Sequence, residues 1–193
     1  MTDPDELGRA IESIARALDG VAARWAIGGS MASATHGEPR ATNDVDVVAE
    51  LDEPRARRLT QLLGIDFYAD ADIAAEAVRT RGSFNVIDKR SFIKIDVFVP
   101  PPGPMGMGQL DRRQFLEIVP SLGALPVLGP EDVVLQKLRW YEIGGRASDR
   151  QWRDIVSVLC ASGGALDDRY LDEVAAGAGL ADLLRKARLD AAS

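Results

Sequence analysis

Apolar residues recur at helical spacing near the start of this chain and form short or alternating runs further along it. The first pattern predicts an amphipathic helix over residues 3–19, with apolar positions at Leu7, Ile11, Ile14 and Leu18. The second predicts strands over residues 24–27, 44–48, 83–87 and 91–99, the last two paired around a turn at 88–90. Shorter helices are expected between these strands, over residues 30–35, 54–63 and 73–78.

The pattern changes after residue 128. A loop rich in proline and glycine precedes this point at residues 100–108, and residues 126–128 are expected to form one short extra strand. Helical patterns then follow over residues 131–141, from 148 to about 163, around 170–174 and over 180–189. We therefore expect an α+β core over residues 1–128 and a helical part over residues 129–193, packed together as one structural unit.

Charge and composition narrow the class of protein. The chain has 193 residues, with 23 Lys and Arg against 30 Asp and Glu, so its formal net charge is −7. This surplus of acid disfavours broad DNA or RNA binding, which depends on many Lys and Arg contacts to phosphate. The single Cys excludes an internal disulfide framework and a cysteine-rich zinc site. With no signal peptide visible and no apolar run of about 18 residues, we expect a cytoplasmic protein without a membrane partner.

Two glycines at the end of an early predicted strand are the first candidate for chemistry. Gly28, Gly29 and Ser30 stand between that strand and a predicted helix. Glycine lets a backbone approach a phosphate closely, and a helix N-terminus offers free N–H groups and the positive end of its dipole. Taken alone, a pair of glycines is more often an ordinary turn.

Three acidic residues form the second candidate. Asp44 and Asp46 lie two positions apart on one predicted strand, so their side chains share a face, and Asp96 interrupts a mostly apolar later strand. If these strands are neighbours, the carboxylates converge and repel one another, and a divalent cation such as Mg²⁺ removes that cost. The pattern supports a two-metal site for in-line displacement at phosphorus. Taken singly, Asp44 and Asp46 fit a solvated edge equally well, and Asp96 fits an ion pair with Lys94 or an arginine.

In this order, these residues resemble the DNA polymerase β-like nucleotidyltransferase superfamily, and within it the minimal bacterial AbiEii type. The resemblance covers most of residues 21–160. It includes further matches at His36-Gly37, Arg40, Thr42, Lys137-Leu138 and Asp154-Ile155, whereas Gln151 replaces an acid usual in the family. The fold it implies is α+β, with a small mixed β-sheet flanked by helices and a C-terminal helical extension.

The resemblance also implies roles for single residues. Asp44 and Asp46 would bind two Mg²⁺ ions, which Mn²⁺ can replace. Asp96 would belong to the same metal site and would help to position or deprotonate the attacking hydroxyl. The nucleotide-binding residues that we expect are Gly28, Gly29, Ser30, Arg40, Thr42 and Lys137. Arg146 and Asp154 are expected only as supporting positions.

Structural explanations compete with functional ones elsewhere in the chain. The arginines around Lys137 form either a solvated helix face or an anion-binding wall: Arg139, Arg146, Arg150 and Arg153. We expect His36 to be structural, Ser148 to cap a helix and Cys160 to be buried and inert. Core positions are expected for the aromatic residues Trp25, Trp140, Tyr141 and Trp152.

Two classes of function fit these residues. The first is Mg²⁺-dependent transfer of a nucleoside monophosphate from an NTP to a hydroxyl on an RNA end, a protein or a small molecule. If the likeness extends to biology, such an enzyme would be the toxin of a toxin–antitoxin pair, with an antitoxin protein as its partner. The second is a non-catalytic nucleotide-binding module with the same fold. Retention of all three acids favours the enzyme, and Gln151 favours the module.

Overall fold

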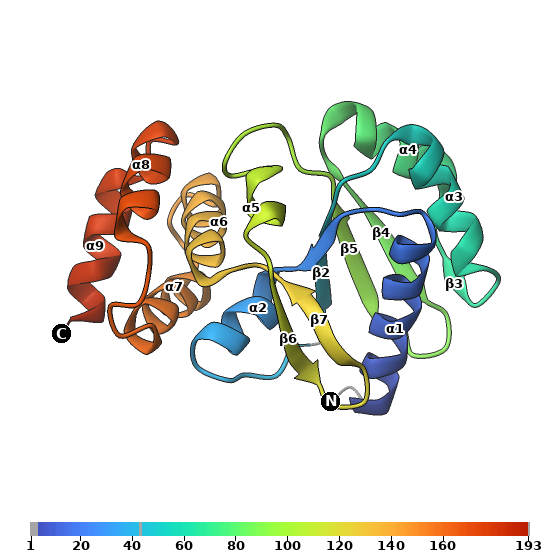
Figure 1. The fold of residues 1–193 in the computed structure, drawn as a ribbon, viewed down its shortest axis with the longest axis horizontal. Coiled ribbons are helices and arrows are strands. Elements are labelled where there is room, and N and C mark those ends of the chain that lie inside the picture. The colour runs from blue at the N-terminus through green and yellow to red at the C-terminus, as the bar shows by residue number, and fades with distance from the viewer. Residues whose placement is uncertain (1–3, 43, 193) are drawn as a thin grey trace.

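A mixed β-sheet is the centre of the structure, a computed structural model that describes residues 4–42 and 44–192 (Figure 1). Within those residues the sheet has seven strands in the order β3-β4-β5-β2-β1-β7-β6. The pairs β2–β5 and β1–β7 are parallel, and the other neighbours are antiparallel. In chain order the strands are β1 (Trp25–Ile27), β2 (Asp44–Ala49), β3 (Phe67–Tyr68), β4 (Ser83–Asp88), β5 (Lys94–Phe98), β6 (Gln114–Val119) and β7 (Gly123–Val127).

Helices cover both faces of this sheet. In chain order they are α1 (Pro4–Gly20), α2 (Gly29–His36), α3 (Glu53–Leu63), α4 (Ala71–Thr80), α5 (Gly108–Asp111), α6 (Pro130–Ile143), α7 (Asp149–Ala161), α8 (Asp168–Gly177) and α9 (Ala181–Ala191). Figure 1 shows α6 to α9 gathered at one end of the molecule, away from α1, α3 and α4. The α+β fold with a mixed sheet, flanking helices and a C-terminal helical extension is confirmed. None of the helices formed by the described residues is long and apolar enough to cross a bilayer.

Two apolar clusters lie on opposite faces of the sheet. One packs α1, α3 and α4 against the inward positions of β2, β4 and β5, where residues such as Val47, Ile95 and Val86 are fully buried. The other joins β1 and β7 to α2 and to the C-terminal helices, with Leu128 and Leu138 at its centre. Because β2, β4 and β5 bury alternate residues against the first cluster, their other residues point to the opposite, more open face.

The predicted elements differ from the structure mainly at the edges of the sheet. The hairpin of β6 and β7 was expected only as a short strand at 126–128, because β6 lies at an edge, where exposed residues weaken the apolar pattern. The two-residue edge strand β3 gave no pattern at all. β5 begins at Lys94 rather than at 91, since Phe92 has a left-handed backbone (φ 59°). Residue 3 of the predicted first helix lies outside the described residues.

Local predictions about single side chains met mixed outcomes. Ser148 caps α7, as predicted, by accepting a hydrogen bond from the backbone N–H of Gln151. Trp25 is buried and donates from Nε1 to Asp19 over 2.9 Å. Two predictions were wrong: Cys160 is exposed where α7 ends beside the end of α9, and Trp140 is 48% exposed on a face of α6 that borders a cavity rather than the core.

Candidate active site

The turn between β1 and α2 lies directly against the strand that carries two of the predicted acids. The backbone N–H of Gly28 donates to the carbonyl of Asp46 over 2.9 Å. Gly29 has a left-handed backbone (φ +54°), and a Cβ added there would lie 1.8 Å from Oδ2 of Asp46. Glycine is therefore required at position 29 both for its backbone conformation and for this close approach. The glycine turn and the Asp46 carboxylate form one structural unit at the N-terminus of α2.

The three acids lie on two neighbouring parallel strands. Asp46 on β2 is in register with Asp96 on β5, and Asp44 is in register with Lys94. Directly paired residues of adjacent strands place their side chains on the same face, so all four side chains belong to the open face. Lys94 donates from Nζ to Oδ2 of Asp96 over 2.8 Å. The ion pair that was one reading of Asp96 is thus present, together with the predicted adjacency of the acids.

The surroundings of Asp46 disfavour the charged form of its carboxyl group. Burial raises the pKa of its carboxyl, and the neighbouring charge of Asp96 raises it further. The backbone N–H of Ser30, which donates to this carboxylate, and the positive charge of Lys137 act in the opposite direction but do not cancel the effect. A carboxylate in this setting is stabilised by additional positive charge nearby, such as the charge of a divalent cation.

Asp154 organises the cationic side of the site. It accepts a hydrogen bond from Lys137 Nζ over 2.7 Å and two from Arg40, at 3.1 and 3.0 Å. Arg40 also donates to Ser30 Oγ over 2.6 Å, which links the network to the glycine turn. Burial alone would raise the pKa of Asp154, but the hydrogen bonds and charges of Arg40 and Lys137 outweigh it and lower the pKa. The Asp154 carboxylate of α7 therefore connects three other segments: α2, α6 and the loop that precedes β2.

The acids fit a divalent cation in ligand type and in register. Asp46 and Asp96 stand side by side with Asp44 on the same face, and their oxygens are the ligands that Mg²⁺ prefers. In the arrangement present, no three His, Cys, Asp or Glu side chains of residues 4–42 and 44–192 are grouped closely enough to hold a metal. Asp96 is paired with Lys94 instead. The two-metal site at these acids therefore stays a prediction.

Some predicted residues lie apart from this centre. Thr42 donates from Oγ1 to the carbonyl of Asp44 over 3.2 Å, a local contact that shapes the start of β2. Arg146 is exposed and pairs with Glu142, four residues earlier, over 2.7 Å. The structural role expected for His36 is consistent with its Nε2, which lies 2.8 Å from the carbonyl oxygen of Leu128.

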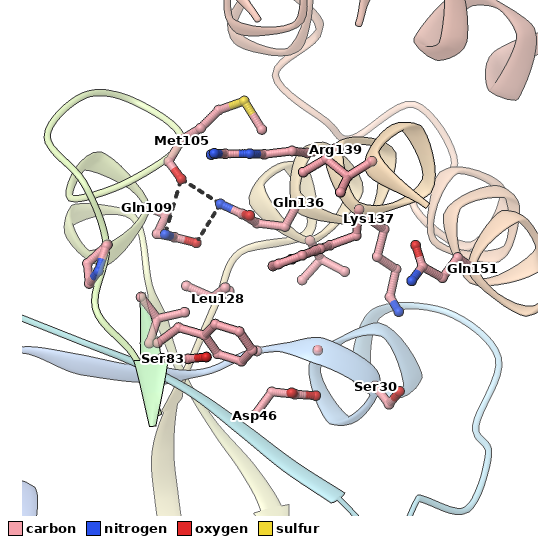
Figure 2. A pocket seen from close by; sticks show the side chains of 18 of the residues that line it. Ser30, Asp46, Ser83, Met105, Gln109, Leu128, Gln136, Lys137, Arg139 and Gln151 are labelled. Carbon is pink, nitrogen blue, oxygen red and sulfur yellow. Dashed lines mark hydrogen bonds between the residues drawn. The ribbon is translucent and has the colours of Figure 1, made fainter. Parts of the chain in front are cut away.

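A cavity of about 820 Å³ opens between the sheet and α6–α7 and contains most of the predicted nucleotide-binding residues (Figure 2). Figure 2 shows Lys137 reaching from α6 toward the side of the cavity where Ser30 and Asp46 lie. One wall of this cavity was not predicted from the sequence. The side chains of that wall include Arg81, Ser83, Phe98, Met105 and Gln136. The helical periodicity of α6 could have indicated Gln136. This residue lies next to Lys137 and one turn before Trp140, and both of these line the cavity.

Aromatic side chains line the part of the cavity farthest along α6. The ring centroids of Phe98 and Trp140 are 6.2 Å apart, and Ile143 lines the cavity one turn beyond Trp140. Gln136 is held by hydrogen bonds from its Nε2 to the carbonyl of Met105 (2.5 Å) and to Oε1 of Gln109 (3.3 Å). An apolar, partly aromatic wall beside a cationic one suits a ligand with a flat ring and phosphates.

Comparison with solved structures identifies the fold. An antigenic nucleotidyltransferase-like protein from Paracoccidioides brasiliensis is 24% identical, with coverage of 96% of this chain and 90% of that one, at a TM-score of 0.59. The antibiotic-resistance factor ANT(2'')-Ia is 13% identical, with coverage of 95% and 94%, at a TM-score of 0.54. No family model matches the chain, and no curated protein matches its sequence. The chain therefore has the fold of nucleotidyltransferase-like proteins over nearly its whole length.

Proposed function

We propose that this protein is a nucleotidyltransferase that moves a nucleoside monophosphate from an NTP to a hydroxyl acceptor. The observation that carries the proposal is the position of Asp46, which is in register with Asp96, lies directly against the glycine turn and shares one cavity with Lys137. A phosphate-binding turn, adjacent carboxylates and a cationic wall are the parts that phosphoryl-group transfer needs. The fold shared with nucleotidyltransferase-like proteins supports the same conclusion.

We propose that the acceptor and the departing phosphates bind on opposite sides of Asp46. The acceptor oxygen attacks the α-phosphorus of the NTP, a new O–P bond forms, and the bond from that phosphorus to the bridging oxygen breaks, which releases pyrophosphate. The proton of the acceptor hydroxyl passes to a carboxylate, for which we propose Asp96, and from there to water. The backbone N–H groups at the start of α2, with Ser30 and Lys137, would bind the departing phosphates.

Mg²⁺ is the metal that we propose for this site, held by Asp44, Asp46 and Asp96, and Mn²⁺ can take its place. When bound, such ions neutralise phosphate charge and lower the pKa of the attacking hydroxyl. The chain's own residues then orient the substrates: Asp154 fixes Lys137 and Arg40, and Arg40 fixes Ser30.

The test is label transfer from each α-labelled NTP, with Mg²⁺ and with lysate RNA and protein as acceptors. We expect the wild type to label an acceptor, and Asp46→Asn and Asp96→Asn to reduce labelling at least about 100-fold because each removes an interaction with charge at the reaction centre. Asp66→Asn is the matched control, since Asp66 is an exposed acid at the far edge of the sheet. Absence of any labelled product, or full activity in Asp46→Asn, would show that the proposal is wrong.

Binding without transfer would identify the alternative, a nucleotide-binding module. In that case NTP with Mg²⁺ raises the melting temperature of the wild type while no acceptor is labelled. We extend the enzyme proposal to a toxin that acts in the cytoplasm and is neutralised by an antitoxin protein. Growth arrest on expression of the wild type, absent for Asp46→Asn, is the expected result for that extension, and normal growth in both contradicts it.

A further inference from the structure

One face of β4 and β5 is open and adjoins the Asp46–Asp96 pair. Asn85 on β4 is in register with Asp96, and Ser83 is in register with Phe98. Both Ser83 and Asn85 are exposed, whereas the residues that alternate with them, such as Phe84, are buried in the core. Since Ser83 is diagonal to Asp96 across this strand pair, the two residues are about 7–8 Å apart.

The order of the strands assigns this face to the acceptor. In an in-line displacement the entering and leaving oxygens stand on opposite sides of the phosphorus. The glycine turn and Ser30, which we propose to face the leaving phosphates, follow β1 on one side of β2, whereas β5 and β4 lie on its other side. Figure 2 shows the same relation, with Ser30 and Ser83 on opposite sides of Asp46. The attacking hydroxyl therefore approaches over β5 and β4.

Arg81 is the cation on this side of the cavity. It stands between α4 and β4 with a left-handed backbone (φ 53°), two residues before Ser83, and lines the cavity together with it. It is exposed, and within the described part of the chain no ion pair or hydrogen bond engages its guanidinium. By contrast, Arg40 and Lys137 on the other side are already shared with Asp154.

The charge of the cavity supports an anionic acceptor. Its cationic side chains are Arg40, Arg81, Lys137, Arg139 and Arg150. Its carboxylates are Asp46 and Asp154, and the latter is already neutralised by two cations. This excess of positive charge, in a chain with a net charge of −7, repels a cationic acceptor and attracts an anionic one.

We propose that the acceptor carries a phosphate near its reacting hydroxyl and that Arg81, with the hydroxyl of Ser83, binds this phosphate. The proposal rests on the transferase function given above and specifies its second substrate. A guanidinium matches phosphate geometry with two parallel N–H donors, and a hydroxyl adds a third. Arg81 acts here as a specificity residue: it contacts the acceptor but takes no part in bond making. Sugar phosphates and nucleic-acid ends share this chemistry.

The experiment compares acceptors that differ only in phosphate. Ribose 5-phosphate and ribose are offered with α-labelled NTP and Mg²⁺, and a dinucleoside monophosphate with a free 3′ hydroxyl tests a nucleic-acid end. We expect at least a 10-fold higher kcat/KM for ribose 5-phosphate or the dinucleotide than for ribose. Whichever of the two is preferred identifies the source of the phosphate. An amino sugar with ammonium groups serves as the cationic probe and should be the poorest acceptor.

Variants assign this preference to Arg81. Arg81→Gln should raise the KM for the phosphorylated acceptor at least about 10-fold while the KM for NTP stays within 2-fold, and Arg81→Lys should recover part of the loss. Arg79→Gln is the matched control, because Arg79 is an exposed arginine in the last turn of α4, two residues before Arg81, that pairs with Glu76 and does not line the cavity. Calorimetry of the preferred acceptor, ribose 5-phosphate or the dinucleotide, without NTP or metal, should show the same weakening in Arg81→Gln alone.

The outcomes separate this proposal from the function on which it rests. The proposal is overturned if neither ribose 5-phosphate nor the dinucleotide is preferred over ribose, or if the amino sugar is the preferred acceptor. It is also overturned if Arg81→Gln raises the KM for NTP instead, or leaves binding of the preferred phosphorylated acceptor unchanged. In each of these cases the transferase function stands as long as the wild type labels an acceptor from lysate. If the wild type labels nothing at all, the proposed function itself fails.

Discussion

Gly29 and Asp46 approach each other so closely that a Cβ on Gly29 would lie 1.8 Å from the Asp46 carboxylate and 2.6 Å from its Cβ. A change of rotamer at Asp46 cannot relieve a clash that extends to its Cβ. The glycine turn and the acid are therefore coupled, because neither can be rebuilt without moving the other. This contact ties the proposed phosphate-binding segment to the proposed metal-binding strand.

Gly29→Ala tests this coupling. We expect it to lower the free energy of unfolding by about 2–4 kcal/mol, since it combines left-handed backbone strain with a steric clash, and to abolish NTP binding. Gly163→Ala is the matched control, because Gly163 has the same positive φ (+54°) but has nothing within 4 Å of the added Cβ. That control should lose only about 1 kcal/mol. Urea unfolding of both variants checks the difference, and equal losses would show that the close approach is unimportant.

Asp154→Asn tests the buried ion network. Removal of this charge leaves Lys137, which is 8% exposed, without its carboxylate, so we expect a loss of about 3 kcal/mol at pH 7. Glu173→Gln breaks an exposed pair with Arg169 on α8 and should cost less than about 1 kcal/mol. The comparison by urea unfolding separates buried from exposed ion pairs, and similar losses for the two variants would contradict the expectation.

The contribution of the same network to the free energy of unfolding should depend on pH. Because the pKa of Asp154 is lower in the folded protein than in the unfolded chain, its contribution is present above the unfolded pKa of about 3.9. It is lost as the pH falls through the lower, folded value. The difference between the wild type and Asp154→Asn should therefore narrow below about pH 4. A difference that grows on acidification would show that the sign is wrong.

Asp132 should show the opposite dependence. It is 1% exposed on α6, hydrogen-bonded by Arg112 and Tyr170, and burial raises its pKa to about 6 despite the charge of Arg112. A raised folded pKa means that the folded state binds the proton more tightly. The contribution of this group to stability is complete below about pH 4 and is lost as the pH rises to about 6.

Asp132→Asn removes this titration. Between pH 4 and 6, the wild type should lose up to about 3 kcal/mol that the variant retains, from a shift of about two pKa units at about 1.4 kcal/mol each. Unfolding in urea at pH 4, 5, 6 and 7 for both proteins gives the comparison. Parallel curves for the wild type and the variant would show that Asp132 does not titrate in this range. Arg112 contacts both Asp132 of α6 and Tyr170 of α8, so this cluster joins the segment after α5 to both helices.

The sequence by itself determined the parts of the site that lie within one element or one turn. Gly28 and Gly29 end a strand, and Asp44 and Asp46 lie on one face of the next strand. Ser148 precedes α7 and caps it with its side chain. Each of these features depends on local backbone geometry. The cation-rich surroundings of Lys137 were also visible in the order of residues, although Arg146 turned out to pair locally with Glu142.

Only the tertiary structure decided which of these parts meet. The parallel pairing of β2 with β5 places Asp96 beside Asp46, and α7 brings Asp154 to Arg40, which is 114 residues earlier. Arg81, Ser83 and Trp140 carry no motif, so nothing in their neighbours along the chain marks them as cavity residues. Strand order and helix packing depend on the burial of apolar surface summed over many residues, so local patterns specify the elements of this protein but not their partners.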